Sequence, residues 1–309
     1  MRYRTALLAT SLLVGALAAG TAGALSEFGI EGMHVVSTRA DEVRASVAPD
    51  GQRIVWARSR REDGAHMPGR ELWQARLIEN RWQDAIPLSL NGTGEDFDPA
   101  FSGDGRWLYF ASNREGDAGG TDLYRAPVLA AGGFGEPQSL GPGVNGIGDE
   151  RAPSVSGDGL RLLFAGNGHG GAGGFDLFVA HWDGAAFVDP RPLPGINTVA
   201  DEIDAAWLGD GEAIVFARAD ATTNATTGPG ATAPTRLYLA QCDGSRYAVA
   251  APLALSFNTA EGRTLGPALD WSRPGELLVS GIAPSPRAGQ TDIYRMKAPT
   301  VTGSPGCVE

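Results

Sequence analysis

Five segments of the chain carry acidic residues at similar intervals, and neighbouring carboxylates are groups that can do chemistry. Four segments are Asp41-Glu42, Glu95-Asp96, Asp149-Glu150 and Asp201-Glu202, and the fifth carries Glu261. Two carboxyl groups at a set separation can hydrolyse a glycosidic bond, and clustered carboxylates can hold a cation. An active site needs one acid and one base, however, whereas these groups recur along the whole chain. The recurrence favours a structural role, in which the carboxylates bind loop amides and neighbouring arginines.

A second set of polar side chains lies in the segments that follow apolar runs of the sequence. The set comprises Arg58, Arg60, Arg61, Asn113, Arg114, Asn167, His169, Arg218 and Arg287. Arginine binds carboxylates and phosphates through paired hydrogen bonds, so such a cluster would attract an anionic ligand or partner. The alternative is that these side chains pair with the acidic residues beside them, and the sequence leaves both interpretations open.

Motifs for other common chemistries are missing from the sequence. The histidines His34, His66, His169 and His181 show no metal-ligand spacing, and no Gly-x-Ser-x-Gly or catalytic cysteine arrangement is found. The glycine-rich run 170–174 leads into a strand and lacks the lysine of a phosphate-binding loop. We therefore predict no cofactor and no metal, and we favour a protein without catalytic activity over an enzyme.

The elements that position these side chains form a repeat. Asp50-Gly51, Asp104-Gly105, Asp158-Gly159 and Asp210-Gly211 follow one another at intervals of 52 to 54 residues, and Pro274-Gly275 comes 64 residues later. Each pair lies between two apolar runs, and Asp-Gly in such a place indicates a tight turn between strands, because glycine tolerates a positive φ.

Each unit continues with two further strands. Three of the third strands begin with an aspartate, Asp122, Asp176 or Asp292, which we interpret as structural because it repeats. Four antiparallel strands per unit predict an all-β, five-bladed β-propeller in one domain, residues 25–309. A six-bladed propeller is the alternative. The predicted blades are approximately 41–90, 95–144, 149–197, 201–257 and 261–297.

The fifth unit lacks a fourth strand, so the ring has to be closed from elsewhere. We predict that residues 33–37 supply the outermost strand of the last blade, which would remove exposed sheet edges. In a propeller, the connections between second and third strands share one face with the linkers between blades. The acidic and basic sets should therefore meet around the mouth of the central channel.

Residues 1–24 have the form of a secretory signal peptide, because Arg2 and Arg4 precede an apolar run that ends in Ala22-Gly23-Ala24. We expect a bacterial periplasmic or secreted monomer with no transmembrane segment after cleavage. An oxidising compartment allows the only two cysteines, Cys242 and Cys307, to form a disulfide that pins the C-terminal tail to the neighbouring blade.

The inner-strand pattern resembles a known family. The run 98–105, followed by 108–114 and by Asp122-Leu123-Tyr124, resembles the TolB-type (WD40-like) repeat of periplasmic β-propellers. Asn197-Thr198 followed by Asp201-Glu202 is similar to blade ends in periplasmic propellers that carry OmpA-like peptidoglycan-binding domains. The resemblance is specific for a fold and not for an activity. TolB-type proteins differ in having six blades after an α/β domain, and no helical pattern precedes the repeat here.

These observations predict an exported, non-catalytic propeller whose channel mouth binds an envelope or extracellular protein, or a small anionic ligand. The alternative is a hydrolase of a carbohydrate or lactone with carboxylates or a metal at the mouth. With 25 basic and 36 acidic residues the formal net charge is −11, which argues against nucleic-acid binding.

Overall fold

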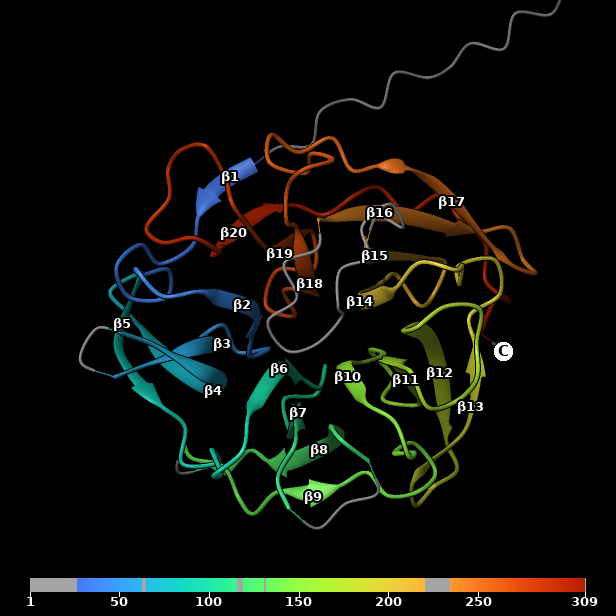
Figure 1. The fold of residues 1–309 in the computed structure, drawn as a ribbon, viewed down its shortest axis with the longest axis horizontal. Helices are drawn as coiled ribbons and strands as arrows, with labels where there is room; N and C mark the ends of the chain where they lie inside the picture. Colours follow the sequence, from blue (N-terminus) through green and yellow to red (C-terminus); the bar gives the residue numbers. More distant parts are fainter. Residues whose placement is uncertain (1–26, 63–64, 116–118, 131, 220–233, 309) are drawn as a thin grey trace, which may run out of the picture.

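The computed structural model describes residues 27–62, 65–115, 119–130, 132–219 and 234–308, and its regular elements in these ranges are strands. Five four-stranded antiparallel sheets surround a central axis (Figure 1). The prediction of a five-bladed β-propeller is therefore confirmed, and the six-bladed alternative is wrong. Within the described ranges, no helix long and apolar enough to cross a membrane is present. The predicted signal peptide lies outside these ranges.

In blades 1 to 4 the strands pair in chain order, from an innermost strand beside the axis to an outermost strand at the rim (Figure 1). Blade 1 consists of β2 (Glu42–Val47), β3 (Arg53–Glu62), β4 (Ala65–Ile78) and β5 (Arg81–Pro87). Blade 2 consists of β6 (Asp96–Phe101), β7 (Trp107–Ser112), β8 (Asp122–Pro127) and β9 (Gln138–Ser139). Blade 3 consists of β10 (Glu150–Val155), β11 (Arg161–Gly166), β12 (Asp176–Trp182) and β13 (Phe187–Pro192). Blade 4 consists of β14 (Glu202–Leu208), β15 (Ala213–Ala219), β16 (Thr235–Cys242) and β17 (Tyr247–Pro252). Blade 5 consists of β18 (Leu265–Leu269), β19 (Glu276–Gly281), β20 (Asp292–Lys297) and β1 (Glu27–Ile30).

The N-terminal segment closes the ring, but with a different strand from the one predicted. Strand β1 pairs antiparallel with β20, so the outermost strand of blade 5 is Glu27–Ile30 and not residues 33–37. Residues 33–37 form a turn instead, because the chain needs a linker between this outermost strand and β2. In that linker the Ser37 hydroxyl accepts a hydrogen bond from the amide of Ile293 at 3.1 Å.

Asparagines hold the corresponding linkers of the other blades. The side-chain oxygen of each accepts the amide hydrogen of a leucine in the third strand of the preceding blade, as Asn145 does from Leu123 at 2.9 Å. The side-chain nitrogen of Asn145 also donates to the Leu123 carbonyl at 3.1 Å. The equivalent residues are Asn91, Asn197 and Asn258. Ser37 thus takes the place of the asparagine in blade 5.

Each innermost strand contains an irregularity at its pairing with the second strand. In four blades, a residue there has a positive φ, between 47° and 60°, and these residues are Arg44, Asp98, Ala152 and Gly266. Such a bulge bends the strand and redirects its side chains. Gly266 is required sterically, because a Cβ there would lie 3.0 Å from the backbone of Arg44.

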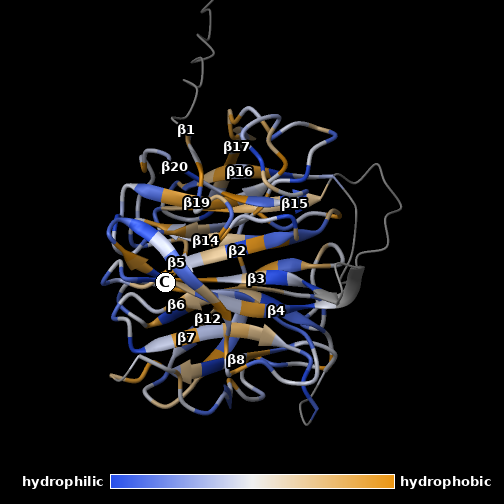
Figure 2. Cartoon of the chain, turned by 90° about the vertical axis from the view of Figure 1, so that its left-hand side faces the viewer, coloured by the Kyte–Doolittle hydropathy of each residue, from blue (hydrophilic) through white to orange (hydrophobic). Residues whose placement is uncertain are grey.

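The core lies between the sheets, where the second and third strands of each blade pack against those of the next blade. Blades 2, 3 and 4 each contain a stacked aromatic pair with ring centroids 5.8 Å apart, formed by Phe110 with Tyr124, Phe164 with Phe178, and Phe216 with Tyr238. In side view, hydrophobic and hydrophilic residues form alternating bands along the strands (Figure 2).

A disulfide joins Cys242 and Cys307, whose Cα atoms are 5.9 Å apart, as predicted. The bond fixes the C-terminal tail beside blade 4, where Asp243 and Ser304 form a parallel bridge. The carbonyl of Val308 lies 3.2 Å from Nε2 of His181 in blade 3, so the tail spans two blades. The bond spans a separation of 65 residues, and the chain-entropy model gives about 4 kcal/mol of stabilisation for a loop of this order.

Candidate ligand-binding site at the channel mouth

The first residue of the innermost strand is a fully buried carboxylate in blades 1 to 4. Each carboxylate lies against a basic side chain of its own blade, which belongs to the second strand (Arg58, Arg218) or to the connection that follows it (Arg114, His169). The pairs are Glu42 with Arg58 (3.3 Å), Asp96 with Arg114 (2.6 Å), Glu150 with His169 (2.9 Å) and Glu202 with Arg218 (2.6 Å). Four of the nine predicted binding residues therefore have partners within their own blade.

Aromatic rings pack against these basic side chains. The guanidinium carbon of Arg58 lies 4.4 Å from the centre of the Trp73 ring, and that of Arg114 lies 4.9 Å from the Tyr124 ring. A guanidinium group over an aromatic face is stabilised electrostatically. His169 packs between the rings of Phe164 and Phe178 at 5.5 and 5.1 Å, so a carboxylate, a basic side chain and an aromatic ring recur together.

Two of these buried carboxylates have a raised pKa. Burial raises the pKa of Glu42 to about 7, although hydrogen bonds from Thr38 and the charge of Arg58 oppose the rise. Burial also raises the pKa of Glu202, against the opposing effects of Thr198 and Arg218. The rise therefore has the same physical cause in blades 1 and 4.

The remaining predicted binding residues lie in these connections or in the second strand before them. The side-chain oxygens of Asn113 and Asn167 accept the amide hydrogens of Glu95 and Asp149, at 2.6 and 2.7 Å. Arg60 donates to the carbonyl of Gly94. Arg61 belongs to β3, and Arg287 is exposed in the connection before β20.

The three aspartates that begin third strands bind backbone amides of the connections before them. Asp122 accepts from Gly119 at 3.4 Å, and Asp176 accepts from Gly173 at 3.1 Å. Asp292 accepts from Ala288 at 2.8 Å and from Gly289 at 3.1 Å. These contacts tie each connection to the sheet that it enters.

Blade 5 departs from the acidic pattern, so the expectation that Glu261 is its fifth member is wrong. In blade 5, Arg263 and Thr264 occupy the positions that correspond to Asp201 and Glu202 in blade 4. The linker between Asn258 and this position is one residue longer than the linker that follows Asn197, which shifts Glu261 out of register. A cation therefore stands where the other four blades place a carboxylate.

Arginines that the sequence analysis did not single out lie closer to the axis. Arg44 is 1% exposed, and its side chain donates to the carbonyls of Pro153 in blade 3 at 2.9 Å and of Ala205 in blade 4 at 3.3 Å. Its Nη1 also lies 3.6 Å from Asp204. Blades 3 and 4 lie opposite blade 1 in a ring of five, so the Arg44 side chain crosses the channel.

Arg151, Arg70 and Arg263 are near enough for their charges to affect one another's titration. The Nε atom of Arg151 lies 3.6 Å from Asp98. Burial and repulsion by Arg151 lower the pKa of Arg70, and burial and repulsion by Arg70 lower the pKa of Arg263. The three guanidinium groups thus influence one another directly. Arg151 could have been noticed in the sequence, because it lies in an innermost strand at a position where an apolar residue is usual.

The channel is nearly closed beyond Arg44. A cavity of about 20 Å³ there is lined by residues from all five innermost strands and by Trp271. The indole nitrogens of Trp207 and Trp271 donate to the carbonyls of Ser154 and Phe101, at 2.8 and 3.0 Å, which fixes both rings.

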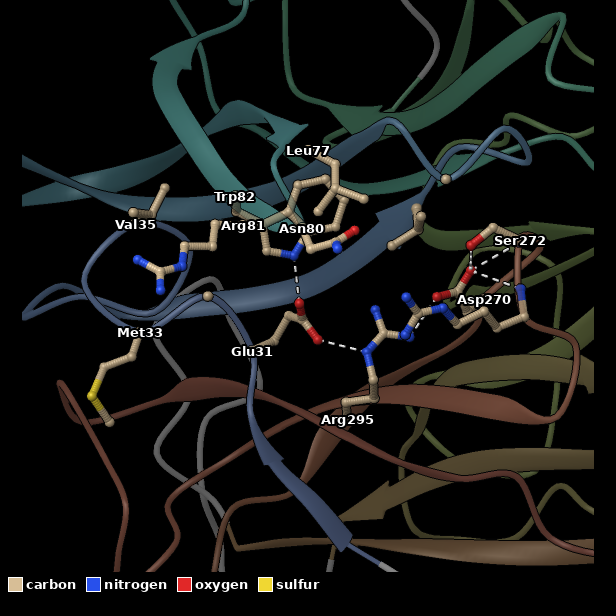
Figure 3. A pocket seen from close by; sticks show the side chains of 14 residues that line it. Glu31, Met33, Val35, Leu77, Asn80, Arg81, Trp82, Asp270, Ser272 and Arg295 are labelled. Carbon is tan, nitrogen blue, oxygen red and sulfur yellow. Dashed lines mark hydrogen bonds and ion pairs between the residues drawn. The ribbon is translucent and has the colours of Figure 1, made fainter.

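A separate pocket of about 470 Å³ lies on the opposite face, where blades 1 and 5 meet (Figure 3). Glu31 lies between Trp82 and Arg295 and accepts hydrogen bonds from both, and Arg295 also binds Asp270 at 2.5 Å. This pocket contains the contacts that close the ring. No group of three or more His, Cys, Asp or Glu side chains suited to a metal ion occurs in the described part of the chain.

The structure is a five-bladed β-propeller whose innermost strands carry paired arginines and aspartates. No protein-family model matches the sequence, and no curated protein matches it. Among solved structures, the chain is similar to a TolB candidate from Agrobacterium tumefaciens, with 13% identity, a TM-score of 0.50, and coverage of 89% of this chain and 99% of that one. It is also similar to a glycoside hydrolase, with 12% identity, a TM-score of 0.52, and coverage of 91% and 94%.

TolB from Acinetobacter baumannii matches at 12% identity and a TM-score of 0.49, over 86% of this chain. The chain spans 57% of the length of that structure. At such identities the likenesses show the fold alone.

Proposed function

We propose that the protein is an exported, non-catalytic propeller of the TolB type that binds a protein or another component of the bacterial envelope through its channel-mouth face. The disulfide supports an oxidising compartment. The resemblance of the repeat and the fold shared with the TolB candidate support the family.

One observation carries the binding role. The charges that repeat from blade to blade are paired inside the fold, as in Asp96 with Arg114. The arginines that break the repeat, Arg70, Arg151 and Arg263, are near enough for their charges to affect one another's titration. A structural device recurs wherever the geometry recurs, whereas a recognition site uses side chains that occur once. An acidic protein with a cationic mouth is suited to an anionic group of a partner.

The test is capture of envelope components by immobilised protein of residues 25–309. We expect a component that the wild type retains and that the variant Arg70→Glu/Arg263→Glu loses. The control is Arg81→Glu, because Arg81 lines the pocket on the opposite face. Equal capture by all three proteins, or no specific capture by the wild type, would contradict the proposal.

A second candidate function is hydrolysis of a carbohydrate or lactone. The observation that favours it is the pKa of Glu42, which is about 7 and suits a general acid. Glu42 also lies close enough to Asp292 for the charge of that carboxylate to raise its pKa. Turnover of aryl glycosides or lactones by the wild type, lost in a folded Glu42→Gln variant, would support this function. Absence of turnover across both substrate classes would eliminate it.

A further inference from the structure

A further cavity lies between blades 2 and 3, at the end of the blades that is opposite the channel mouth. Its volume is about 270 Å³, and the tight turns at Asp104 and Asp158 form part of its lining. These turns join the first and second strands of their blades, whereas the mouth carries the connections between second and third strands. The cavity is therefore separate from the face that the proposed partner would use.

Three aromatic side chains and one arginine line this cavity. Trp107, Tyr109 and Arg125 come from blade 2, and Trp182 comes from blade 3. Tyr109 pairs directly with Arg125 across β7 and β8, and Trp107 lies two residues before Tyr109, so the three side chains share one face of blade 2. The guanidinium carbon of Arg125 lies 4.2 Å from the centre of the Trp107 ring and 5.3 Å from that of the Trp182 ring. The arginine is thus held beside one indole from each blade.

The carboxylates that line the cavity are used by other arginines. Asp104 lies 2.6 Å from Arg106, and Asp158 lies 3.3 Å from Arg161. Arg125 is partly buried, and across the ranges that the structure describes no ion pair joins it to an aspartate or glutamate. Its guanidinium group can therefore bind the carboxylate of a ligand through charge-assisted hydrogen bonds.

The two indole groups can serve a ligand as well. In the described part of the chain the indole nitrogens of Trp107 and Trp182 donate no hydrogen bond, whereas those of Trp207 and Trp271 do. An indole group offers a flat apolar surface and one N–H donor. A sugar ring carries C–H groups on its faces and hydroxyl groups at its edge, so it complements both parts of an indole.

We propose that this cavity binds one residue of an acidic saccharide, such as a uronic acid, whose carboxylate pairs with Arg125 and whose ring packs against Trp107 and Trp182. Arginine binds a carboxylate through two parallel hydrogen bonds, so the charged group fixes the orientation of the sugar. Aromatic walls with a few polar groups that set orientation are typical of small-molecule sites. The saccharide site is a second binding function, on the face opposite the mouth.

The experiment is titration calorimetry of the purified protein with glucuronate at low ionic strength. Glucose, which lacks the carboxylate, and benzoate, which lacks the hydroxyl groups, are titrated beside it. We expect saturable binding of glucuronate, at least about tenfold tighter than that of either comparison compound, and weakened about tenfold by Arg125→Gln. The matched control is Arg191→Gln, because the Arg191 side chain is 64% exposed in blade 3, and it should bind like the wild type.

A second variant separates binding from folding. Arg125→Gln also removes packing against two rings, so thermal unfolding is measured for each variant. Trp182→Phe keeps an aromatic ring and removes an N–H donor, and it should bind glucuronate about threefold more weakly. Glucuronate should change the tryptophan fluorescence of the wild type, and the change should be smaller in Trp182→Phe.

Three results would overturn the inference. These are no binding of glucuronate up to about 10 mM, unchanged affinity in both folded variants, and binding of glucose or benzoate as tight as that of glucuronate. Capture of an envelope component at the mouth does not involve Arg125 or Trp182. The saccharide site and the proposed function can therefore fail independently, and each failure is recognisable.

Discussion

The Nε atom of Arg295 in β20 lies 2.6 Å from a carboxylate oxygen of Glu31, so an ion pair joins two ends of the chain that are 264 residues apart. The other oxygen of Glu31 accepts a hydrogen bond from the indole of Trp82 in blade 1. Arg295 is 9% exposed and also binds Asp270 and Glu276, at 2.5 and 2.8 Å. One glutamate therefore connects the first blade, the last blade and the N-terminal strand.

Replacing Glu31 by alanine should lower the free energy of unfolding by about 3 kcal/mol, because it breaks a largely buried ion pair and leaves the Trp82 indole without its acceptor. Denaturant unfolding of the variant measures the loss. Glu136→Ala is the control, because Glu136 is exposed, and it should change stability by less than about 0.5 kcal/mol. Similar stabilities for both variants would mean that β1 does not depend on this contact.

The stability of the protein should fall as the pH rises from about 4.5 to about 7. Glu42 has a pKa of about 7 in the folded protein, above its value in the unfolded chain, so the folded state binds the proton more tightly. This contribution is complete below the unfolded pKa, is lost as the pH passes through the folded pKa, and amounts to about 2 to 3 kcal/mol. Glu202 acts in the same direction.

Urea unfolding of the wild type and of Glu42→Gln at intervals between pH 5 and 8 measures this dependence. The glutamine keeps an acceptor for Thr38 but cannot titrate, so the variant should show a flatter profile over this window. A variant with the same slope as the wild type would show that Glu42 does not titrate near neutrality.

Arg218→Met should act on stability and not on partner binding. The substitution leaves Glu202 fully buried without its cation, at a cost of about 2 kcal/mol in the free energy of unfolding. Arg287→Met serves as the comparison, because it removes an exposed arginine and should leave the thermal midpoint unchanged. Weakened capture of an envelope component by a fully stable Arg218→Met protein would return this arginine to the set of binding residues.

Loss of the disulfide should release the C-terminal tail and lower stability by up to about 4 kcal/mol. The double variant Cys242→Ser/Cys307→Ser is compared with the wild type by thermal unfolding and by limited proteolysis after residue 300. A thiol titration of the denatured wild type should find no free thiol before reduction and two after it. Two free thiols before reduction would contradict the bond.

The repeat could be predicted because its signals are local. Asp-Gly turns such as Asp104-Gly105 fix the spacing of the strands, and Gly105 has the positive φ of 70° that the turn requires. The closing strand could not be placed, because β1 is four residues long, contains a glycine and is mostly exposed. Its position depends on pairing with β20, about 265 residues away, which leaves no local pattern in either segment.

The sequence analysis singled out arginines other than those of the innermost strands. Arg114 and Arg218 follow apolar runs and are easily noticed, yet each pairs with a carboxylate in its own blade. The position of Arg151 follows from the convergence of five innermost strands, and that of Arg70 from an extended hairpin. Only the assembled ring brings these side chains together.

The Arg44 side chain lies across the axis, where carbonyls of blades 3 and 4 accept its hydrogen bonds. One residue of blade 1 thereby ties the innermost strands of three blades together. Tilting of any one of these three blades would stretch these bonds, so Arg44 favours a rigid ring.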